Sequence, residues 1–271
     1  MREYTDNGDL TKSHRKKNQF YSSFVIKVMI RIVTGLLLAF MICLIVLFYY
    51  QTPELLLCES GEPGPTVLVV GGTHGNEPAG SVAAYQLQHL LQHRLQRGTV
   101  IIIPNANKWG LHVNLRFLPA ELLSFGLLGK PDLNRSYAHR GEEARTVIAK
   151  EIQELALQAD WVVDLHEGYD FHKLNPNSMG SGIYPGKSEM SHLLTDPLLH
   201  AVNQTIKNLD YQFVTKEWPD EKGTLRMFCD ENDIHYTLVE TSGQDNIQPL
   251  DIRVQQHLSI LRALLHELKM I

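Results

Sequence analysis

An uncharged run of nineteen residues near the start of the chain limits its possible folds more than any other feature. It reads IVTGLLLAFMICLIVLFYY and covers residues 32–50 of the 271-residue sequence. About 20 apolar residues in a helix match the hydrocarbon thickness of a bilayer, and helices in soluble cores rarely run so long without a polar face. The run therefore predicts a transmembrane helix, which the preceding FVIKVMIR extends to residues 24–50.

The sequence around this run favours an uncleaved signal anchor over a cleaved signal peptide. A cleaved signal usually has an apolar core of about 7–15 residues followed by small residues, whereas this run ends in FYYQTPE. Residues 1–31 carry seven Lys or Arg against three acidic residues, and basic flanks stay in the cytoplasm. We expect a polar, basic tail over 1–23 with residues 1–20 disordered, membrane contact through 24–50, and residues 51–271 on the exoplasmic or periplasmic side.

The charge of the remaining chain excludes one class of partner. The formal net charge is −5 overall and about +4 over residues 1–31, which leaves about −9 for residues 32–271. An acidic body argues against nucleic acid as a partner. Of three cysteines, Cys43 lies in the apolar run, while Cys58 and Cys229 could pair in an oxidising compartment or remain unpaired.

Strand and helix patterns alternate after residue 65. Continuous apolar runs such as TVLVVGG are typical of strands covered on both faces, and 3.6-residue periodicity indicates helices. We expect strands at 66–72, 99–107, 159–168, 211–218 and 235–243, and helices at 80–96, 140–159, 193–209 and 247–269. This order predicts a three-layer α/β/α sandwich with a mixed, largely parallel sheet over 66–271, preceded by one transmembrane helix and by a linker or edge segment at 51–65.

Two long irregular segments, 108–139 and 168–192, interrupt this alternation. Long loops in compact domains are commonly functional. The second segment is rich in aromatic and turn residues, so we expect it to face substrate through Tyr169, Asn175, Ser178 and Tyr184, unless it is an ordered surface loop without ligand contact.

Polar side chains stand at strand ends that should meet at one edge of the sheet. His74 and Glu77 follow the first strand in GGTHGNE, and His166 ends the third strand in DLHEG. Two imidazoles and one carboxylate form a zinc site that keeps a coordination position open for water. The glycines at 71 and 72 are expected to make room for the metal. Glu167 points to the opposite side of the strand, which suggests a structural role.

Four separated motifs carry a family resemblance. HGNE, then DLNR at 132–135, then DLH at 164–166, then a glutamate on a late strand follow one another in the order and spacing of the zinc carboxypeptidase superfamily. Over residues 66–245 the chain most resembles the succinylglutamate desuccinylase/aspartoacylase branch of that superfamily.

The resemblance implies a metal centre and a base. His74, Glu77 and His166 match the ligands of one zinc ion, and Glu240 matches the general base. Asp132 matches a carboxylate that orients a histidine ligand, and such partners fix the histidine tautomer.

The resemblance also implies substrate contacts. Asn134 and Arg135 match a pair that binds a substrate carboxylate, for which the guanidinium offers a planar fork. Arg116 is the candidate for the arginine that polarises the scissile carbonyl. Its distance upstream of Asn134 resembles the carboxypeptidase pattern. The chain departs here from the aspartoacylase branch, which usually has an arginine closer to DLNR, since the interval 123–131 contains none.

These roles together predict a membrane-anchored, zinc-dependent hydrolase. Its substrate would be a small amide or peptide with a free carboxylate, cleaved by an N-acyl amino acid deacylase or desuccinylase-like activity. A metallocarboxypeptidase or cell-wall peptide amidase is the alternative, favoured by the location and by an open site. A catalytically dead, anchored binding module is the second alternative.

Overall fold

The computed structural model describes residues 7–118, 132–217 and 219–271, which divide into two units at residues 49 and 50. Helix α1 (Asn7–Gln51) makes up the N-terminal unit, and its segment Phe24–Gln51 is long and apolar enough to cross a membrane, with a mean hydropathy of 2.8. The expectation of disorder over residues 1–20 is wrong from Asn7 onward, where α1 begins. No proline interrupts these residues, and extending an existing helix costs far less than nucleating one.

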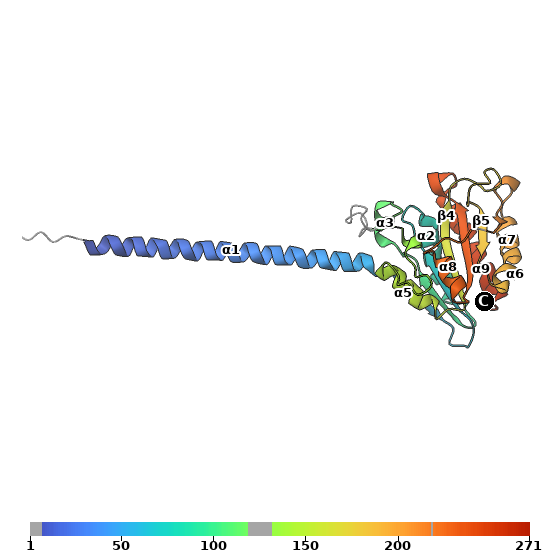
Figure 1. Cartoon of the computed structure of the whole chain (residues 1–271), viewed down its shortest axis with the longest axis horizontal. Coiled ribbons are helices and arrows are strands. Elements are labelled where there is room, and N and C mark those ends of the chain that lie inside the picture. The colour runs from blue at the N-terminus through green and yellow to red at the C-terminus, as the bar shows by residue number, and fades with distance from the viewer. Residues whose placement is uncertain (1–6, 119–131, 218) are drawn as a thin grey trace, which may run out of the picture. The chain divides into compact units, whose positions relative to one another are not determined.

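The second unit contains a seven-stranded sheet with the order β1-β3-β2-β4-β7-β5-β6 in the described part of the chain. Figure 1 shows this unit as strands flanked by helices. The strands are β1 (Leu56–Glu59), β2 (Thr66–Gly71), β3 (Thr99–Ile103), β4 (Trp161–Gly168), β5 (Gly182–Pro185), β6 (Val214–Thr215) and β7 (His235–Ser242). The four central strands β3, β2, β4 and β7 are parallel, whereas β1 and β5 run antiparallel to β3 and β7. The predicted mixed, largely parallel sheet is confirmed.

Helices cover both faces of this sheet and complete the predicted three layers. Helices α2 (Pro78–Leu91), α7 (Thr195–Asn203) and α9 (Leu250–Glu267) pack on one face, where Val67 and Val69 of β2 are fully buried. Helices α5 (Val147–Ala156) and α8 (Leu225–Glu231) pack on the other face, against Leu68 and Val70. Alternate residues of a strand point to opposite faces, so the apolar run of β2 fits a strand that is buried on both sides.

Short elements occupy the connections between these layers. They are α3 (Lys108–Val113), α6 (Glu189–Leu193), and the 3₁₀ turns η1 (Leu133–Arg135), η2 (Leu209–Tyr211) and η3 (Gln244–Asn246). The segment at 51–65, expected as a linker or an edge segment, contains the edge strand β1. The segment 168–192, expected to be irregular, contains β5 and the start of α6. A four-residue strand among glycines and prolines leaves no period-2 pattern to detect.

Two expected elements are shorter than their sequence patterns indicate. The expected helix at 140–159 begins only at Val147, because the Thr146 side chain caps it by accepting the Ala149 N–H at 3.1 Å. Glu142 therefore lies outside the helix and contacts Lys222 at 2.6 Å. Of the expected strand at 211–218, only β6 forms, and the first residue of that range belongs to η2.

Cys58 and Cys229 do not pair. Both are buried and free, and they belong to the apolar clusters on opposite faces of the sheet. A disulfide needs Cα atoms within about 7 Å. Each therefore acts as a small core side chain.

The strand order creates one reversal point, between β2 and β4. The chain leaves β2 to form β3 on one side and then returns to form β4 on the other side. Ligands of open parallel sheets bind outside the carboxyl ends of strands at such a point. The polar residues after β2 and at the end of β4 therefore lie where a site is expected.

Candidate metal centre

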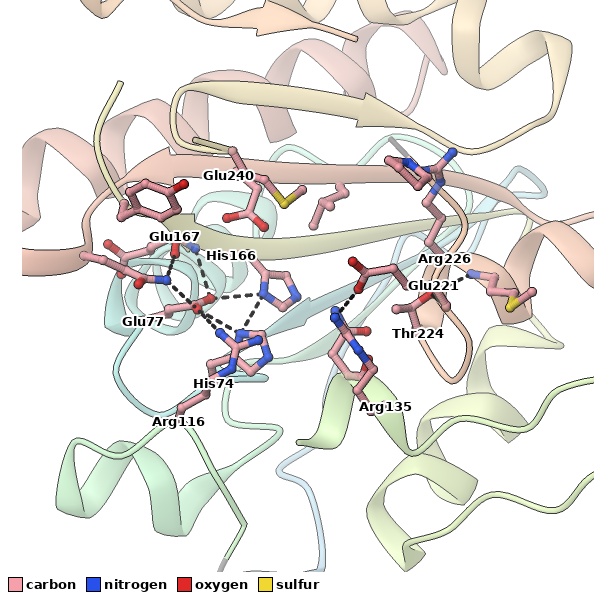
Figure 2. A pocket seen from close by; sticks show the side chains of 18 of the residues that line it. His74, Glu77, Arg116, Arg135, His166, Glu167, Glu221, Thr224, Arg226 and Glu240 are labelled. Carbon is pink, nitrogen blue, oxygen red and sulfur yellow. Dashed lines mark hydrogen bonds and ion pairs between the residues drawn. The ribbon is translucent and has the colours of Figure 1, made fainter. Parts of the chain in front are cut away.

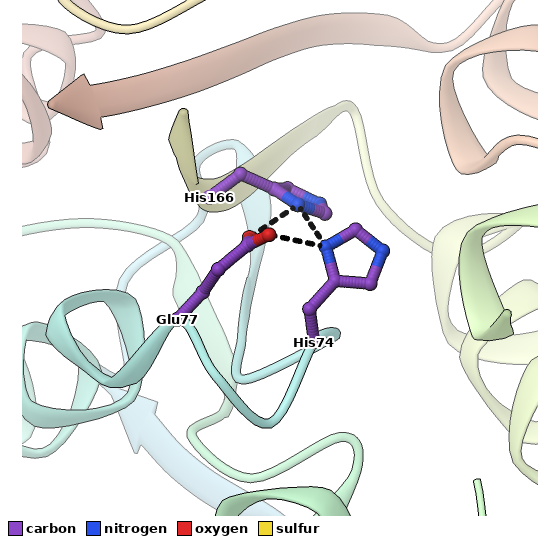
Figure 3. A group of neighbouring side chains, drawn as sticks. All are labelled: His74, Glu77 and His166. Atoms are coloured by element: carbon purple, nitrogen blue, oxygen red, sulfur yellow. Dashed lines mark hydrogen bonds and ion pairs between the residues drawn. The ribbon is translucent and has the colours of Figure 1, made fainter. Parts of the chain in front are cut away.

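His74, Glu77 and His166 form one buried cluster at this reversal point (Figure 3). His74 Nδ1 lies 2.8 Å from Glu77 Oε1, and His166 Nδ1 lies 3.0 Å from Glu77 Oε2. The two Nδ1 atoms lie 3.1 Å apart. All three side chains are at most 3% exposed. The cluster expected from the sequence is thus assembled by the turn after β2 and the end of β4.

The donor set of this cluster fits a divalent metal. His74 Nε2 lies 3.0 Å from Asp132 Oδ1, and His166 Nε2 lies 3.0 Å from Asp164 Oδ1. A carboxylate beside Nε2 favours the tautomer with the proton on that nitrogen, which leaves a lone pair on Nδ1. Two lone pairs and a carboxylate then converge on one point. A cation bound at that point compensates three electron-rich groups that would otherwise repel one another.

The neighbouring charges shift the acid–base behaviour of the cluster. Burial alone would raise the pKa of Glu77, but the adjacent His74 and His166 hold it well below its usual range. Burial likewise opposes the charged form of His166, yet Asp164 and Glu77 raise its pKa well above the ordinary value. The pKa of Asp132 is also well below its usual range, because His74 and Arg116 outweigh its burial. The carboxylates of Glu77 and Asp132 are therefore held ionised.

The turn from β2 into α2 presents two of the cluster residues on one side. The Glu77 N–H donates to the His74 carbonyl at 3.1 Å, and Pro78 opens the helix directly afterwards. Gly72 has a φ of +67°, and a side chain at Gly75 would collide with the backbone of Gly110. The expectation that glycines here make room for the metal is wrong: their nearest neighbours are backbone and core atoms of α2, α3 and the loop after β3.

Asp132 connects the cluster to Arg116. One carboxylate oxygen faces His74, and the other accepts from Arg116 Nε at 3.0 Å and from Nη2 at 2.9 Å. Arg116 Nη1 also reaches Glu77 Oε1 at 3.2 Å. The structure thus brings Arg116 to the cluster, with about a third of its side chain exposed. The interval 123–131, in which the related branch usually has its arginine, lies outside the described residues.

Asn134 and Arg135 stand on η1, directly after Asp132. The Asp132 side chain fixes this turn by accepting the Asn134 N–H at 2.9 Å. Asn134 Oδ1 accepts from the Leu225 N–H at 3.1 Å. Arg135 forms an ion pair with Glu221, in which both side chains are more than a third exposed. An exposed pair of this kind contributes little to stability, so a competing carboxylate can displace Glu221.

Glu240 faces the same cleft from β7 (Figure 2). It stands in register with His166 on the adjacent parallel strand, so both side chains point to the same face. Burial, partly offset by His166 and reinforced by Glu77, raises the pKa of Glu240 to about 8. The cleft has about 820 Å³ of empty volume, part of it open to solvent. It is lined by all the predicted site residues except Asp132, which lies behind His74.

Sequence reasoning assigned no role to several residues that support the cluster. Asp164 is fully buried and accepts from Tyr236 Oη at 3.0 Å and from Thr73 Oγ1 at 3.4 Å. Its two-residue spacing from His166 on β4 places both on one face, a signal that could have identified it. Gln244 Nε2 donates to Glu77 Oε1 at 3.2 Å. No sequence pattern pointed to Gln244, because the contact spans 167 residues.

Of the four candidates in 168–192, Tyr169 alone lines the cleft. Ser178 and Tyr184 are buried and donate to the carbonyls of Tyr169 and Met179, so they hold the segment in shape. Asn175 accepts from the Asn177 N–H at 3.2 Å within the same turn.

Glu167 contacts α2 and α9, as expected for a structural residue on the opposite side of the strand. It accepts the Ala79 N–H at 2.6 Å and pairs with Arg253.

Solved structures of other proteins share this α/β architecture. Product-bound cell shape determinant protein Csd4 from Helicobacter pylori matches with a TM-score of 0.65 and 20% identity, covering 81% of this chain and 56% of Csd4. A succinylglutamate desuccinylase from Silicibacter matches with a TM-score of 0.57 and 21% identity, covering 81% and 61%. At these identities the similarity establishes the fold, and the chain spans little more than half the length of these proteins.

A family model matches part of the sequence. Residues 63–176 match the succinylglutamate desuccinylase/aspartoacylase catalytic domain, a range that contains His74, Glu77 and His166. The match covers less than half of the chain, and it supports membership of this family. No curated protein sequence matches it.

Proposed function

We propose that this protein is a zinc-dependent hydrolase that cleaves an amide bond next to a carboxylate-bearing group. The convergence of His74 Nδ1, His166 Nδ1 and the Glu77 carboxylate carries this proposal. These three residues would hold one zinc ion. When bound, zinc supplies a Lewis acid that activates water near neutral pH and polarises a carbonyl.

The protein's own residues supply the remaining roles. Glu240 takes a proton from the attacking water and returns it to the leaving amine, a task suited to a carboxyl whose pKa burial has raised toward neutrality. Arg116 lies at the edge of the cluster, where its Nη1 can donate to an oxygen that gains negative charge. Asp132 and Asp164 hold the two histidines in the tautomer that leaves Nδ1 unprotonated.

The substrate's carboxylate would bind at η1. Arg135 offers its guanidinium fork, and Asn134 stands beside it on the same turn. Both face the cleft that contains the metal cluster. An amide bond near a carboxylate therefore fits the cleft, and we propose an N-acyl amino acid deacylase or desuccinylase-like activity.

A metallocarboxypeptidase or cell-wall peptide amidase is the second candidate. The fold similarity to Csd4 supports it, because that protein is described as a D,L-carboxypeptidase and has been solved with a tripeptide. A dead binding module has less support, since the cluster and Glu240 are all in place.

The function is tested with the purified chain loaded with zinc. We expect N-acyl amino acids to be hydrolysed and the corresponding N-acyl amino acid amides, which lack the carboxylate, to react at least about tenfold more slowly, because a charged hydrogen bond contributes about 1.5–3 kcal/mol. The measurement is release of the free α-amino group, which is the amino acid from one substrate and the amino acid amide from the other. Cleavage of peptides alone would establish the carboxypeptidase candidate instead, and no cleavage with bound zinc would favour the binding module.

A variant checks the carboxylate site in the same assay. Arg135→Ala is expected to raise KM about 10–100-fold for the carboxylate substrate and to leave the slow amide substrate nearly unchanged. Arg140→Ala, an exposed arginine on the neighbouring loop, is the matched control. Equal effects of Arg135→Ala on both substrates would remove Arg135 from the carboxylate site.

The apolar helix gives the proposed location. We propose that residues 24–50 anchor the chain, with a basic cytoplasmic tail over 1–23 and the hydrolase domain, 66–271, on the exoplasmic or periplasmic side. Since β1 pairs with β3, the structured body begins inside the 51–65 segment. We expect the chain to stay in membranes after washing at alkaline pH, and a chain lacking residues 1–50 to be released.

A further inference from the structure

Gln244 contacts the cluster of His74, Glu77 and His166. It does so from the end of β7, a strand that contributes no residue to this cluster. It stands in η3, immediately after β7. Its Nε2 donates one hydrogen bond to Glu77 Oε1 at 3.2 Å and another to the Glu167 carbonyl at 2.7 Å. Both amide hydrogens are therefore used, and both hold the side chain against the ends of β4 and of the turn after β2.

Three donors outside the two histidines form hydrogen bonds to the Glu77 carboxylate, which the histidine Nδ1 atoms only adjoin. The Glu167 N–H donates to Oε2 at 3.1 Å, and Arg116 Nη1 and Gln244 Nε2 donate to Oε1, each at 3.2 Å. The backbone N–H fixes one oxygen, and Gln244 fixes the other. Of the two side-chain donors, Arg116 is charged and Gln244 is neutral. Gln244 can therefore orient the Glu77 carboxylate without neutralising the negative charge that a metal ion would bind.

The backbone around Gln244 adopts a costly conformation that holds it in this place. Asp245 and Asn246 both have positive φ angles, 63° and 54°. Each such residue costs roughly 1 kcal/mol, although Asp and Asn tolerate the left-handed region better than most. A side chain at Gly243 would collide with the Glu167 carboxylate. Backbone strain at a ligand site persists only when the surroundings fix it, as they do here.

Contacts on both sides hold this turn. The Gly243 N–H donates to the Gly168 carbonyl at 3.0 Å, and the Asn246 N–H donates to the Gly243 carbonyl at 3.1 Å. Gln248 Nε2 donates to the Ser242 carbonyl at 3.0 Å. The turn thus keeps its shape through contacts that do not involve Glu77, which leaves the Gln244 side chain free to act on the cluster.

We propose that Gln244 is a positioning residue for Glu77: it orients the carboxylate so that Glu77 completes a divalent metal site with His74 and His166. This inference rests on the proposed function, because that function supplies the metal ion. It adds a contact from beyond β7 that couples the strand bearing Glu240 to the cluster across β4. Partners of metal ligands typically change metal affinity about 10–100-fold.

The test measures zinc affinity of the whole chain by competition with a chromophoric chelator, without an activity assay. Gln244→Met keeps the length of the side chain but cannot donate a hydrogen bond. Gln244→Glu keeps the shape and brings a carboxylate against Glu77. We expect both variants to bind zinc about 10–100-fold more weakly than the original chain.

A matched control separates the hydrogen bond from the turn. Gln248→Ala removes a buried glutamine of the same turn that contacts Ser242 and Gln256 but not Glu77. It is expected to lower the thermal stability of the metal-free chain while zinc affinity changes less than about threefold. Circular dichroism of the metal-free variants checks that each one is folded.

The outcomes distinguish this inference from the proposed function. Wild-type zinc affinity in Gln244→Met would overturn the positioning role and leave the metal centre intact. Equal losses of affinity in Gln244→Met and Gln248→Ala would also overturn it, because the turn and not the hydrogen bond would then matter. Absence of zinc binding by the original chain would overturn the metal centre, and the inference with it.

Discussion

Glu240→Gln is expected to lower kcat about 10²–10⁴-fold and to leave zinc bound. Glu240 faces the cleft in register with His166, and its carboxyl is the group placed to exchange a proton with water and the leaving amine. Glutamine keeps the shape but cannot accept and return a proton. The measurements are turnover of an N-acyl amino acid and zinc content of the purified variant.

Glu154→Gln, an exposed change on α5, is the control and should retain full activity. More than about a tenth of the original turnover in Glu240→Gln would refute the base assignment. Loss of zinc would instead show that Glu240 supports the metal.

The pH dependence of stability gives a second readout for Glu240 in the metal-free protein. Its folded-state pKa is raised from 4.5 to about 8. The stability it contributes is therefore fully present below about pH 4.5 and is lost as the pH rises toward 8. Glu240→Gln should be more stable than the original metal-free chain at pH 8, and this advantage should shrink toward pH 5.

His166→Ala is expected to reduce zinc affinity more than 100-fold and to abolish turnover. Changes in partners that orient ligands typically cost about 10–100-fold in affinity, so removal of a ligand should exceed that range. Asp164→Asn should reduce zinc affinity by about 10–100-fold, because Asp164 contacts His166 Nε2 and is not itself a proposed ligand. Zinc affinity by chelator competition ranks the two variants.

His172→Ala is the control for this pair of variants. His172 contacts the Ser178 carbonyl outside the cluster, and its removal should leave zinc affinity unchanged. If His166→Ala bound zinc as tightly as Asp164→Asn, His166 would not be a ligand. Dialysis against a chelator should likewise abolish turnover of the original chain, and added zinc should restore it.

The periodic parts of the fold could be predicted from the sequence. β2 and β3 are nearly continuous apolar runs, and burial on both faces is what produces such runs. Short elements escaped this reasoning. β5 has four residues among glycines and prolines, and α5 begins late because Thr146 caps it. A helix cap or a single antiparallel strand pairing produces no periodic pattern of apolar residues in the sequence.

The residues of the site likewise divide into those that sequence motifs identify and those that only the packed structure reveals. The order of the motifs along the chain is enough to single out His74, Glu77, Asp132, Asn134, Arg135, His166 and Glu240, and the spacing adds Arg116. Asp164 could have been added from its two-residue spacing to His166. Gln244 could not, because it reaches Glu77 through a turn of left-handed residues that no pattern announces.

Periodicity and short motifs are local properties of the chain, so they suffice to predict an apolar helix, an α/β body and the residues able to hold a metal. Which atoms face one another depends on the packed molecule. Asp132 and Asp164 contact the histidine Nε2 atoms and so turn both Nδ1 atoms toward Glu77, Glu221 forms an ion pair with Arg135, and Gln244 reaches Glu77 across β4. These contacts join residues far apart in the chain, so only packing of the sheet and its loops could fix them.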